Sequence, residues 1–197
     1  ADYAANYRRR AARLLWDGVK FQHHVHLDPI EHGDFDEYDQ LAMGNTWAVT
    51  RGLASPEQAR SVVDEYRRRQ AATGDAYPWW SLQPGYPDEL GYFKEEHRKQ
   101  GGYANGGLMP WVGGELCLGA FQCGREDYAV ELLRQYADHL RRTGGAQVWY
   151  WPDGQARTGR TITSLTPMAV RACVMNVTVC EAIWPGPPSD VSRAGVN

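Results

Sequence analysis

Three segments of the chain space their apolar and charged residues like amphipathic α-helices. In residues 126–143 the apolar side chains recur at i, i+1, i+4, i+5, i+8, i+9 and i+12, and charged side chains occupy the opposite face. Residues 56–72 show the same stripe, and Ser55-Pro56 is a typical helix start, an N-cap followed by proline at the first helical position. Residues 2–16 look similar. Their side chains predicted to face inward are Tyr7, Ala11, Leu14 and Leu15.

Other segments are apolar on nearly every side. Residues 109–123 and 167–184 have no solvated face, and residues 38–53 are intermediate. A helix without a polar face must be covered on several sides. We therefore expect these segments to be inner helices and the amphipathic ones to be outer helices, in a double layer of α/α hairpins.

An internal repeat supports the hairpins. Residues 47–54 lead through a turn at Gly52 into one outer helix, and residues 118–125 lead through a turn at Gly124 into another, 72 residues later. Two copies of inner helix, glycine turn and outer helix indicate stacked hairpins. The predicted fold is all-α, an α/α-hairpin array over residues 1–184, followed by a Pro/Gly/Ser-rich tail over residues 185–197.

Long connections run over residues 17–37, 73–102 and 144–163, each after an outer helix. If the helices alternate in direction, all three connections emerge on one face, where long loops usually carry function. They hold four of the eight Trp, with Trp16 at the margin of the first connection, and five of the six His. The chain has eleven Tyr but only four Phe, a bias typical of a surface that stacks on a ligand and also hydrogen-bonds to it.

Charge and cysteine content exclude several classes of function. The formal net charge is −3 without a long run of one sign, which argues against a nucleic-acid partner or an anionic membrane. No apolar stretch reaches the ~18 residues of a membrane span. The four cysteines show no C-x-x-C spacing, so we expect buried free thiols and a cytoplasmic location.

One block has the residues of a ligand-binding loop: Tyr103-x-Asn105-Gly106-Gly107-x-x-Pro110. The free N–H groups of a helix start and the small glycines would let a sugar hydroxyl approach the backbone. The alternative is a tight loop-to-helix entry, since glycine and proline are ordinary turn residues.

With Gly124-Arg125 nineteen residues after Asn105, this block resembles the Y-x-N-G-G-x-W-P…G-R segment of (α/α)6-barrel, or six-hairpin, glycosidases. Alkaline/neutral invertases, trehalases, processing α-glucosidases and cellobiose-type phosphorylases have related versions. The similarity covers roughly residues 35–184, although Met109 stands where the pattern usually has Trp. It implies half or most of an (α/α)6 toroid that acts on a carbohydrate ligand without a cofactor. The expected substrate-binding residues are Trp79, Trp80, Tyr103, Asn105, Gly106, Gly107, Trp111, Trp149 and Trp151.

Inverting members of this superfamily use an acid and a base about 6.5–9.5 Å apart. Counted without gaps from Asn105, the base position falls on Gln147, whose neutral amide cannot take a proton from water. Three interpretations remain open: an inactive or sugar-binding homologue, a Glu→Gln trapping variant, or phosphorylase-like chemistry that uses phosphate. The acid lies in the other half of the barrel, which a second chain could supply.

Two carboxylates are further catalytic candidates. Asp36 shares a helix face with Asp39, which suits acid–base chemistry or sugar binding, but also simply a helix N-terminus. Glu115 lies in an otherwise apolar helix, where a carboxylate must either pair with an arginine or face a cavity.

A histidine-rich stretch offers a last alternative. In an extended segment His24, His26 and Asp28 would point the same way and could bind a divalent metal with an open position. An H-x-H pair more often means hydrogen-bonded loop histidines. The sequence-based prediction therefore assigns no metal.

Overall fold

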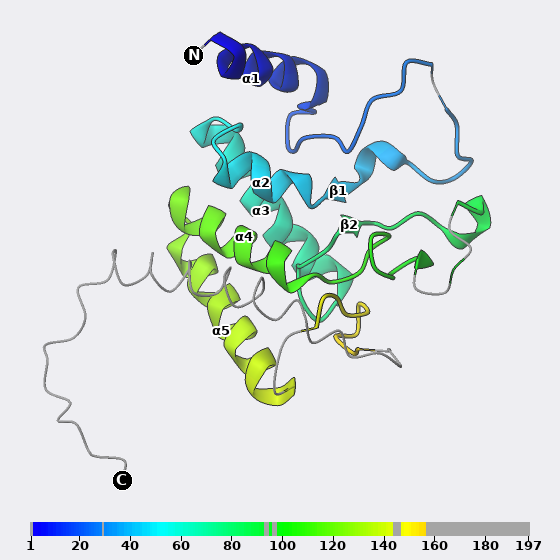
Figure 1. Ribbon diagram of the computed structural model, residues 1–197, viewed down its shortest axis with the longest axis vertical. Helices are drawn as coiled ribbons and strands as arrows, with labels where there is room; N and C mark the ends of the chain where they lie inside the picture. The colour runs from blue at the N-terminus through cyan, green and yellow to red at the C-terminus, as the bar shows by residue number, and fades with distance from the viewer. Residues whose placement is uncertain (1, 29, 93–94, 96–97, 144–146, 157–197) are drawn as a thin grey trace, which may run out of the picture.

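The computed structural model describes residues 2–28, 30–92, 95, 98–143 and 147–156, and this part of the chain is mostly helical (Figure 1). Its helices are α1 (Asp2–Leu15), α2 (Gly44–Thr50), α3 (Pro56–Thr73), α4 (Pro110–Gln122) and α5 (Glu126–Thr143), with short 3-10 helices η1 (Glu37–Asp39) and η2 (Asp88–Leu90). Strands β1 (Leu41–Ala42) and β2 (Leu82–Gln83) form a small antiparallel sheet, with Leu41 opposite Gln83.

The predicted hairpin repeat is confirmed for α2–α3 and α4–α5. Gly52 and Gly124 both have positive φ, +68° and +80°, a backbone conformation that glycine adopts without steric cost. The turns share three backbone hydrogen bonds at equivalent positions, among them Leu53 N to Ala48 O at 2.9 Å and Arg125 N to Ala120 O at 2.8 Å. The same sequence offset of 72 residues therefore produces the same turn twice.

The start of α3 also agrees with its sequence signal. Ser55 Oγ accepts a hydrogen bond from Gln58 N at 3.2 Å, and Ser55 N donates to Gln58 Oε1 at 3.0 Å, which completes a capping box before Pro56. The helix ends at Thr73, and the glycine that follows, Gly74, has φ +72°. Local sequence chemistry thus sets both ends of this helix.

Helix α4 packs closely because of its glycines. A Cβ at Gly113 would overlap the ring of Trp79, and one at Gly119 would lie 2.9 Å from Val49 Cγ1 of α2. The core between α2, α3, α4 and α5 is rich in aromatic side chains. Its largest fully buried ones are Trp79, Trp80, Tyr66, Tyr128 and Tyr150.

The predicted helix over residues 38–53 is only partly present. Residues 41–42 form strand β1 instead, because they pair with β2, and Met43 N bonds to Ser81 O next to this pair. The Asn45 side chain accepts from Phe21 N and donates to Phe21 O, both at 2.8 Å, and so fixes the start of α2 to a distant loop. Long-range pairing here replaces the helical hydrogen bonds.

Helix α1 is present, but the prediction of its inward face is partly wrong. Tyr7 is 66% and Leu14 50% exposed, and no residue of α1 is fully buried. Figure 1 shows α1 at the edge of the molecule, and its last residue, Leu15, packs against the core together with Trp16, which follows the helix. The predicted helix over 167–184 and the tail over 185–197 lie outside the described residues.

The described parts of the second and third long loops meet at the end of the hairpins opposite the glycine turns, and His32 and Glu37 of the first contact Tyr92 and Tyr86 of the second (Figure 1). Isolated β-bridges join Trp80 to Leu108 and Leu108 to Tyr150, and Ala76 N donates to Pro152 O at 2.8 Å. As expected from the alternation of the helices, these loops share one end of the domain.

Candidate functional site

The loop over residues 101–109 uses its polar groups within the protein. Gly106 N donates to Ser81 Oγ, Gly107 N to Tyr103 O, and Leu108 N to Tyr150 O. A Cβ at Gly107 would lie 2.5 Å from Tyr103 O, so glycine is needed for the tight fold of the loop and not for the approach of a ligand. Of the two interpretations of this block, the loop-to-helix entry is the one that the structure supports.

Asn105 has a structural role in the same loop. Its Oδ1 accepts from Tyr86 N at 2.6 Å and its Nδ2 donates to Tyr86 O at 3.0 Å. The side-chain amide thus pairs with the backbone of Tyr86 as a neighbouring strand would. The side chain is buried. Asn105, Gly106 and Gly107, predicted from the sequence as ligand contacts, therefore hold two loops together.

Trp79 and Trp80 are predicted from the sequence as substrate contacts, but both rings are buried and offer no surface on which a sugar could stack. They are 0% and 1% exposed. Trp79 stacks on Tyr77 with ring centroids 4.0 Å apart, and Trp80 stacks on Tyr66 while its Nε1 donates to Asp75 Oδ2 at 2.7 Å. Both rings are core residues that fill the space between the loops and the helices.

Other predicted aromatic residues do reach the surface. Tyr103 is exposed, and Trp149 and Trp151 are half-buried. The ring centroids of Tyr103 and Trp149 are 6.2 Å apart, and those of Trp149 and Trp151 are 5.1 Å apart. We call these three residues the aromatic cluster. Tyr103 has φ +26°, a strained conformation of the kind found at functional sites.

Gln147 lies on the same loop as the two tryptophans of the cluster. Its backbone N donates to Tyr150 Oη at 2.7 Å, which anchors the residue, and its side chain is half-buried. Trp111, another predicted ligand contact, lies elsewhere, on α4, where it stacks on Trp47 of α2 with centroids 5.1 Å apart.

The two carboxylate candidates are occupied by other contacts. Glu115 accepts from Thr50 Oγ1 at 2.6 Å and from Arg51 Nη2 at 2.9 Å, so it is paired with an arginine. Asp36 is exposed and caps η1 by accepting from Tyr38 N at 2.9 Å. Neither carboxylate is placed as a catalytic acid facing a substrate would be.

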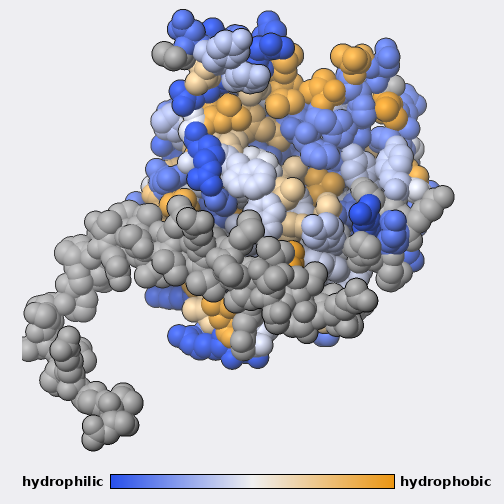
Figure 2. Space-filling model, in the orientation of Figure 1, coloured by the Kyte–Doolittle hydropathy of each residue, from blue (hydrophilic) through white to orange (hydrophobic). Residues whose placement is uncertain are grey.

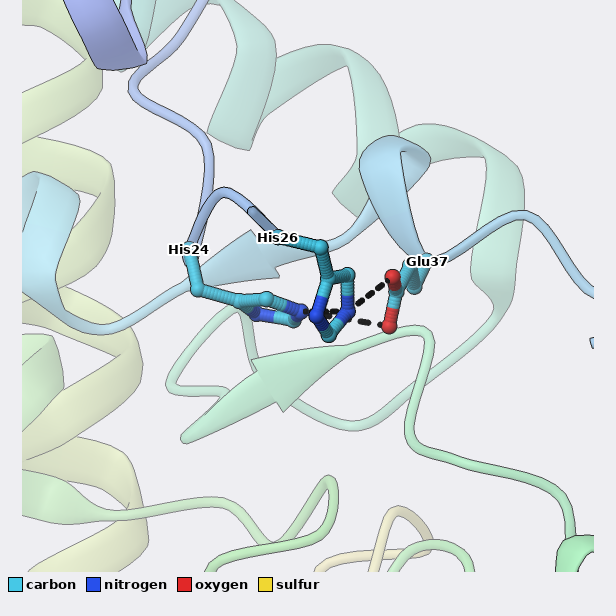
Figure 3. Close-up of side chains that lie close together, drawn as sticks. All are labelled: His24, His26 and Glu37. Atoms are coloured by element: carbon cyan, nitrogen blue, oxygen red, sulfur yellow. Dashed lines mark hydrogen bonds and ion pairs between the residues drawn. The ribbon is translucent and has the colours of Figure 1, made fainter. Parts of the chain in front are cut away.

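A second group of polar residues, which we call the histidine cluster, gathers His24, His26, His32 and Glu37 (Figure 3 draws three of them). His24 Nε2 lies 2.8 Å from His26 Nε2 and 3.2 Å from Glu37 Oε2. His26 Nε2 lies 2.5 Å from Glu37 Oε1, and His32 Nε2 lies 3.0 Å from Glu37 Oε2. These contacts hold His24, His26 and His32 against η1.

The electrostatics of this cluster centre on Glu37, which is buried. Burial alone would raise the pKa of its carboxyl group. The hydrogen bond from His32 and the charges of the three histidines outweigh that effect, and the pKa is lowered. Burial and the nearby Glu37 carboxylate raise the pKa of Tyr86, whose hydroxyl donates to Glu37 Oε2, to about 12.

Sequence reasoning missed Glu37 and His32. It marked the H-x-H pair as a possible ligand pair, but it chose Asp28 as the third residue, and Asp28 is exposed and outside the cluster. Glu37 is one of several acidic residues in residues 36–39, and no periodicity distinguishes it. Tertiary contacts, and not a local pattern, bring it to the histidines.

A cavity of about 520 Å³ lies between the end of α1 and α2, where Figure 2 shows apolar residues gathered. Its walls are mostly apolar and include Leu15, Phe21, Ala48 and Leu53. Such walls offer few partners for sugar hydroxyls, so we do not assign the carbohydrate to this cavity.

No protein-family model matches the sequence, and no curated protein is significantly similar to it. Among the residues that the structure describes, no helix is both long enough and apolar enough to cross a bilayer.

Proposed function

We propose that this chain is a carbohydrate-active domain of the glycoside hydrolase type and that a sugar binds on the aromatic cluster. The observation that carries the proposal is the grouping of Tyr103, Trp149 and Trp151, partly exposed, on two adjoining loops. A sugar ring has an apolar face that stacks on such rings, while the polar atoms of Trp and Tyr bond its hydroxyls. Gln147, on the same loop, would bond a hydroxyl or hold a water.

The proposal extends to the architecture. Two confirmed hairpins, together with the resemblance to six-hairpin glycosidases, support half or most of an (α/α)6 toroid. The exposed Tyr7 and Leu14 of α1 and the exposed Trp47 of α2 leave apolar surface that further helices, from this chain or a second chain, would cover. Cys117 and Cys123 are free thiols, which fits a cytoplasmic location.

Sugar binding is tested with a panel of α- and β-glucosides, followed by intrinsic tryptophan fluorescence and calorimetry. We expect Trp149→Ala to weaken binding by about tenfold, since an aromatic contact contributes about 0.5–1.5 kcal/mol beyond its buried area. Tyr3→Ala is the matched control, because Tyr3 is an exposed aromatic residue on α1, outside the cluster. Equal loss in both variants, or no binding by the wild type, would overturn the assignment.

The neutral side chain of Gln147 favours a second candidate, a sugar-binding homologue without catalysis. Gln147→Glu restores a carboxylate at the base position of the superfamily. Hydrolysis gained by this variant, with the other half of the barrel present, would support an inverting glycosidase scaffold. Sugar binding without hydrolysis in both the wild type and Gln147→Glu would support the binding homologue. Turnover that occurs only when inorganic phosphate is present would support a phosphorylase.

A further inference from the structure

We propose that His24, His26 and Glu37 form a binding site for a divalent transition-metal ion, with His32 as a positioning residue for the carboxylate. One ligand atom from each of the three residues lies within 4.8 Å of the others. The residues come from a loop and from η1, 11 to 13 positions apart, so folding alone brings them together (Figure 3). The assignment departs from the sequence-based expectation of no metal.

The hydrogen bonds within the histidine cluster leave one acceptor unsatisfied. Glu37 Oε1 is buried and makes no hydrogen bond among the described residues, although His26 Nε2 lies only 2.5 Å away. His24 Nε2 and His26 Nε2 face each other at 2.8 Å, and two N–H groups cannot both donate along that line. At least one of the two nitrogens is therefore an acceptor, and a ligand atom of each histidine lies within 4.8 Å of a Glu37 carboxylate oxygen. An ion bound between them would replace the close contact of the two nitrogens.

The opposite side of Glu37 is held in place. His32 Nε2 lies 3.0 Å from Oε2, and Tyr86 Oη donates to the same oxygen at 3.4 Å. Tyr92 Oη lies 3.3 Å from His32 Nδ1 and orients that ring in turn. His32 and Tyr86 thus hold Oε2 from outside the proposed ligand set, whereas Oε1 lies beside His26, itself a proposed ligand. Metal sites use such outer partners to orient their ligands.

The ligand set selects the class of metal. Two imidazoles and one carboxylate suit Zn²⁺ and neighbouring first-row ions, whereas Mg²⁺ and Ca²⁺ prefer oxygen alone. The side chains of His24 and His26 are 30% and 24% exposed, while that of Glu37 is 3% exposed. A bound ion would therefore face solvent on the histidine side, with a coordination position open to water or to a ligand oxygen.

The test uses the full chain, freed of any histidine tag and treated with EDTA. Calorimetric titration with ZnCl₂ should give one ion per chain, and titration with MgCl₂ should give no binding. We expect His26→Gln and Glu37→Gln to abolish this binding or to weaken it by more than a hundredfold. Asp28→Asn is the matched control, because Asp28 is the carboxylate that the sequence alone suggested, and it should bind zinc like the wild type.

Cobalt distinguishes a ligand from a positioning residue. Co²⁺ bound to the wild type should give a visible absorption spectrum that reports its ligands. His32→Gln should keep that spectrum but weaken affinity by about 10–100-fold, the usual effect of losing an outer partner. His26→Gln should lose the spectrum. An unchanged affinity in His32→Gln would remove the positioning role.

Two results would overturn the site. One is a wild type that takes up no zinc in the titration. The other is zinc binding of equal strength in the wild type and the ligand variants, which would place the ion elsewhere, for example on cysteines. If Glu37→Gln does not fold, as judged by circular dichroism, His24→Gln replaces it, because His24 is the most exposed of the three ligands. Sugar binding, measured separately on the same variants, tests the proposed function independently.

Discussion

Replacing Asn105 tests whether the Asn-Gly-Gly block holds the loops together or contacts a ligand. Its side chain makes two hydrogen bonds to the backbone of Tyr86, from Tyr86 N at 2.6 Å and to Tyr86 O at 3.0 Å. Asn105→Ala removes both while leaving the backbone of Tyr86 in a partly buried position. If the role is structural, the free energy of unfolding must fall.

The size of the loss follows from these two bonds. Each contributes about 1 kcal/mol net, and each backbone group that loses its partner adds a desolvation cost of about 1–3 kcal/mol when it is fully buried. Since Tyr86 is only partly buried, we expect a total loss of about 2–4 kcal/mol. Asn105→Asp keeps the acceptor but turns a carboxylate oxygen toward Tyr86 O, so it should cost at least as much.

Urea unfolding, followed by tryptophan fluorescence, measures this loss. The variant should unfold at a lower midpoint urea concentration, while the dependence of the free energy of unfolding on urea concentration stays the same. Tyr103→Ala serves as the comparison, because Tyr103 is an exposed side chain in the same loop and should change stability by less than about 0.5 kcal/mol. The structural reasoning fails if Asn105→Ala unfolds at the same urea concentration as the wild type while sugar binding is lost.

Two further predictions concern buried charge. Arg69 is buried and bonds Glu65, Gln83 and Asp39, so Arg69→Met should lower the free energy of unfolding, measured with urea, by about 3 kcal/mol. Arg68 is exposed, and Arg68→Met should lower it by less than about 1 kcal/mol. Equal losses in the two variants would refute this ranking. Burial, with a smaller effect of a nearby arginine, lowers the pKa of His139 to about 4. The unfolded chain, with a pKa near 6.5, then binds the proton first, so stability is lost as pH falls from about 6.5 to 4, by up to about 3 kcal/mol. Stability measured across this range should depend less on pH in His139→Gln, and an unchanged profile would contradict the assignment.

Much of the helical framework was predictable from local sequence. The stripes of residues 56–72 and 126–143, the Ser55-Pro56 start and the two glycine turns all describe neighbours along one helix or turn. Their physical basis is short-range, in side-chain periodicity, capping and the permitted φ of glycine. The hairpins therefore follow from the sequence alone.

The site required the tertiary structure. Aromatic residues looked alike in the sequence, but packing against α3 and α4 buries Trp79 and Trp80, while Trp149 and Trp151 stay partly exposed. The sequence marked His24 and His26 but suggested the wrong carboxylate, because residues close in the chain are the only neighbours that a pattern can show. Glu37 reaches them because β1 pairs with β2 and because Arg69 of α3 bonds Asp39 of η1. Such contacts between distant segments, and not local propensity, decide which side chains share a site.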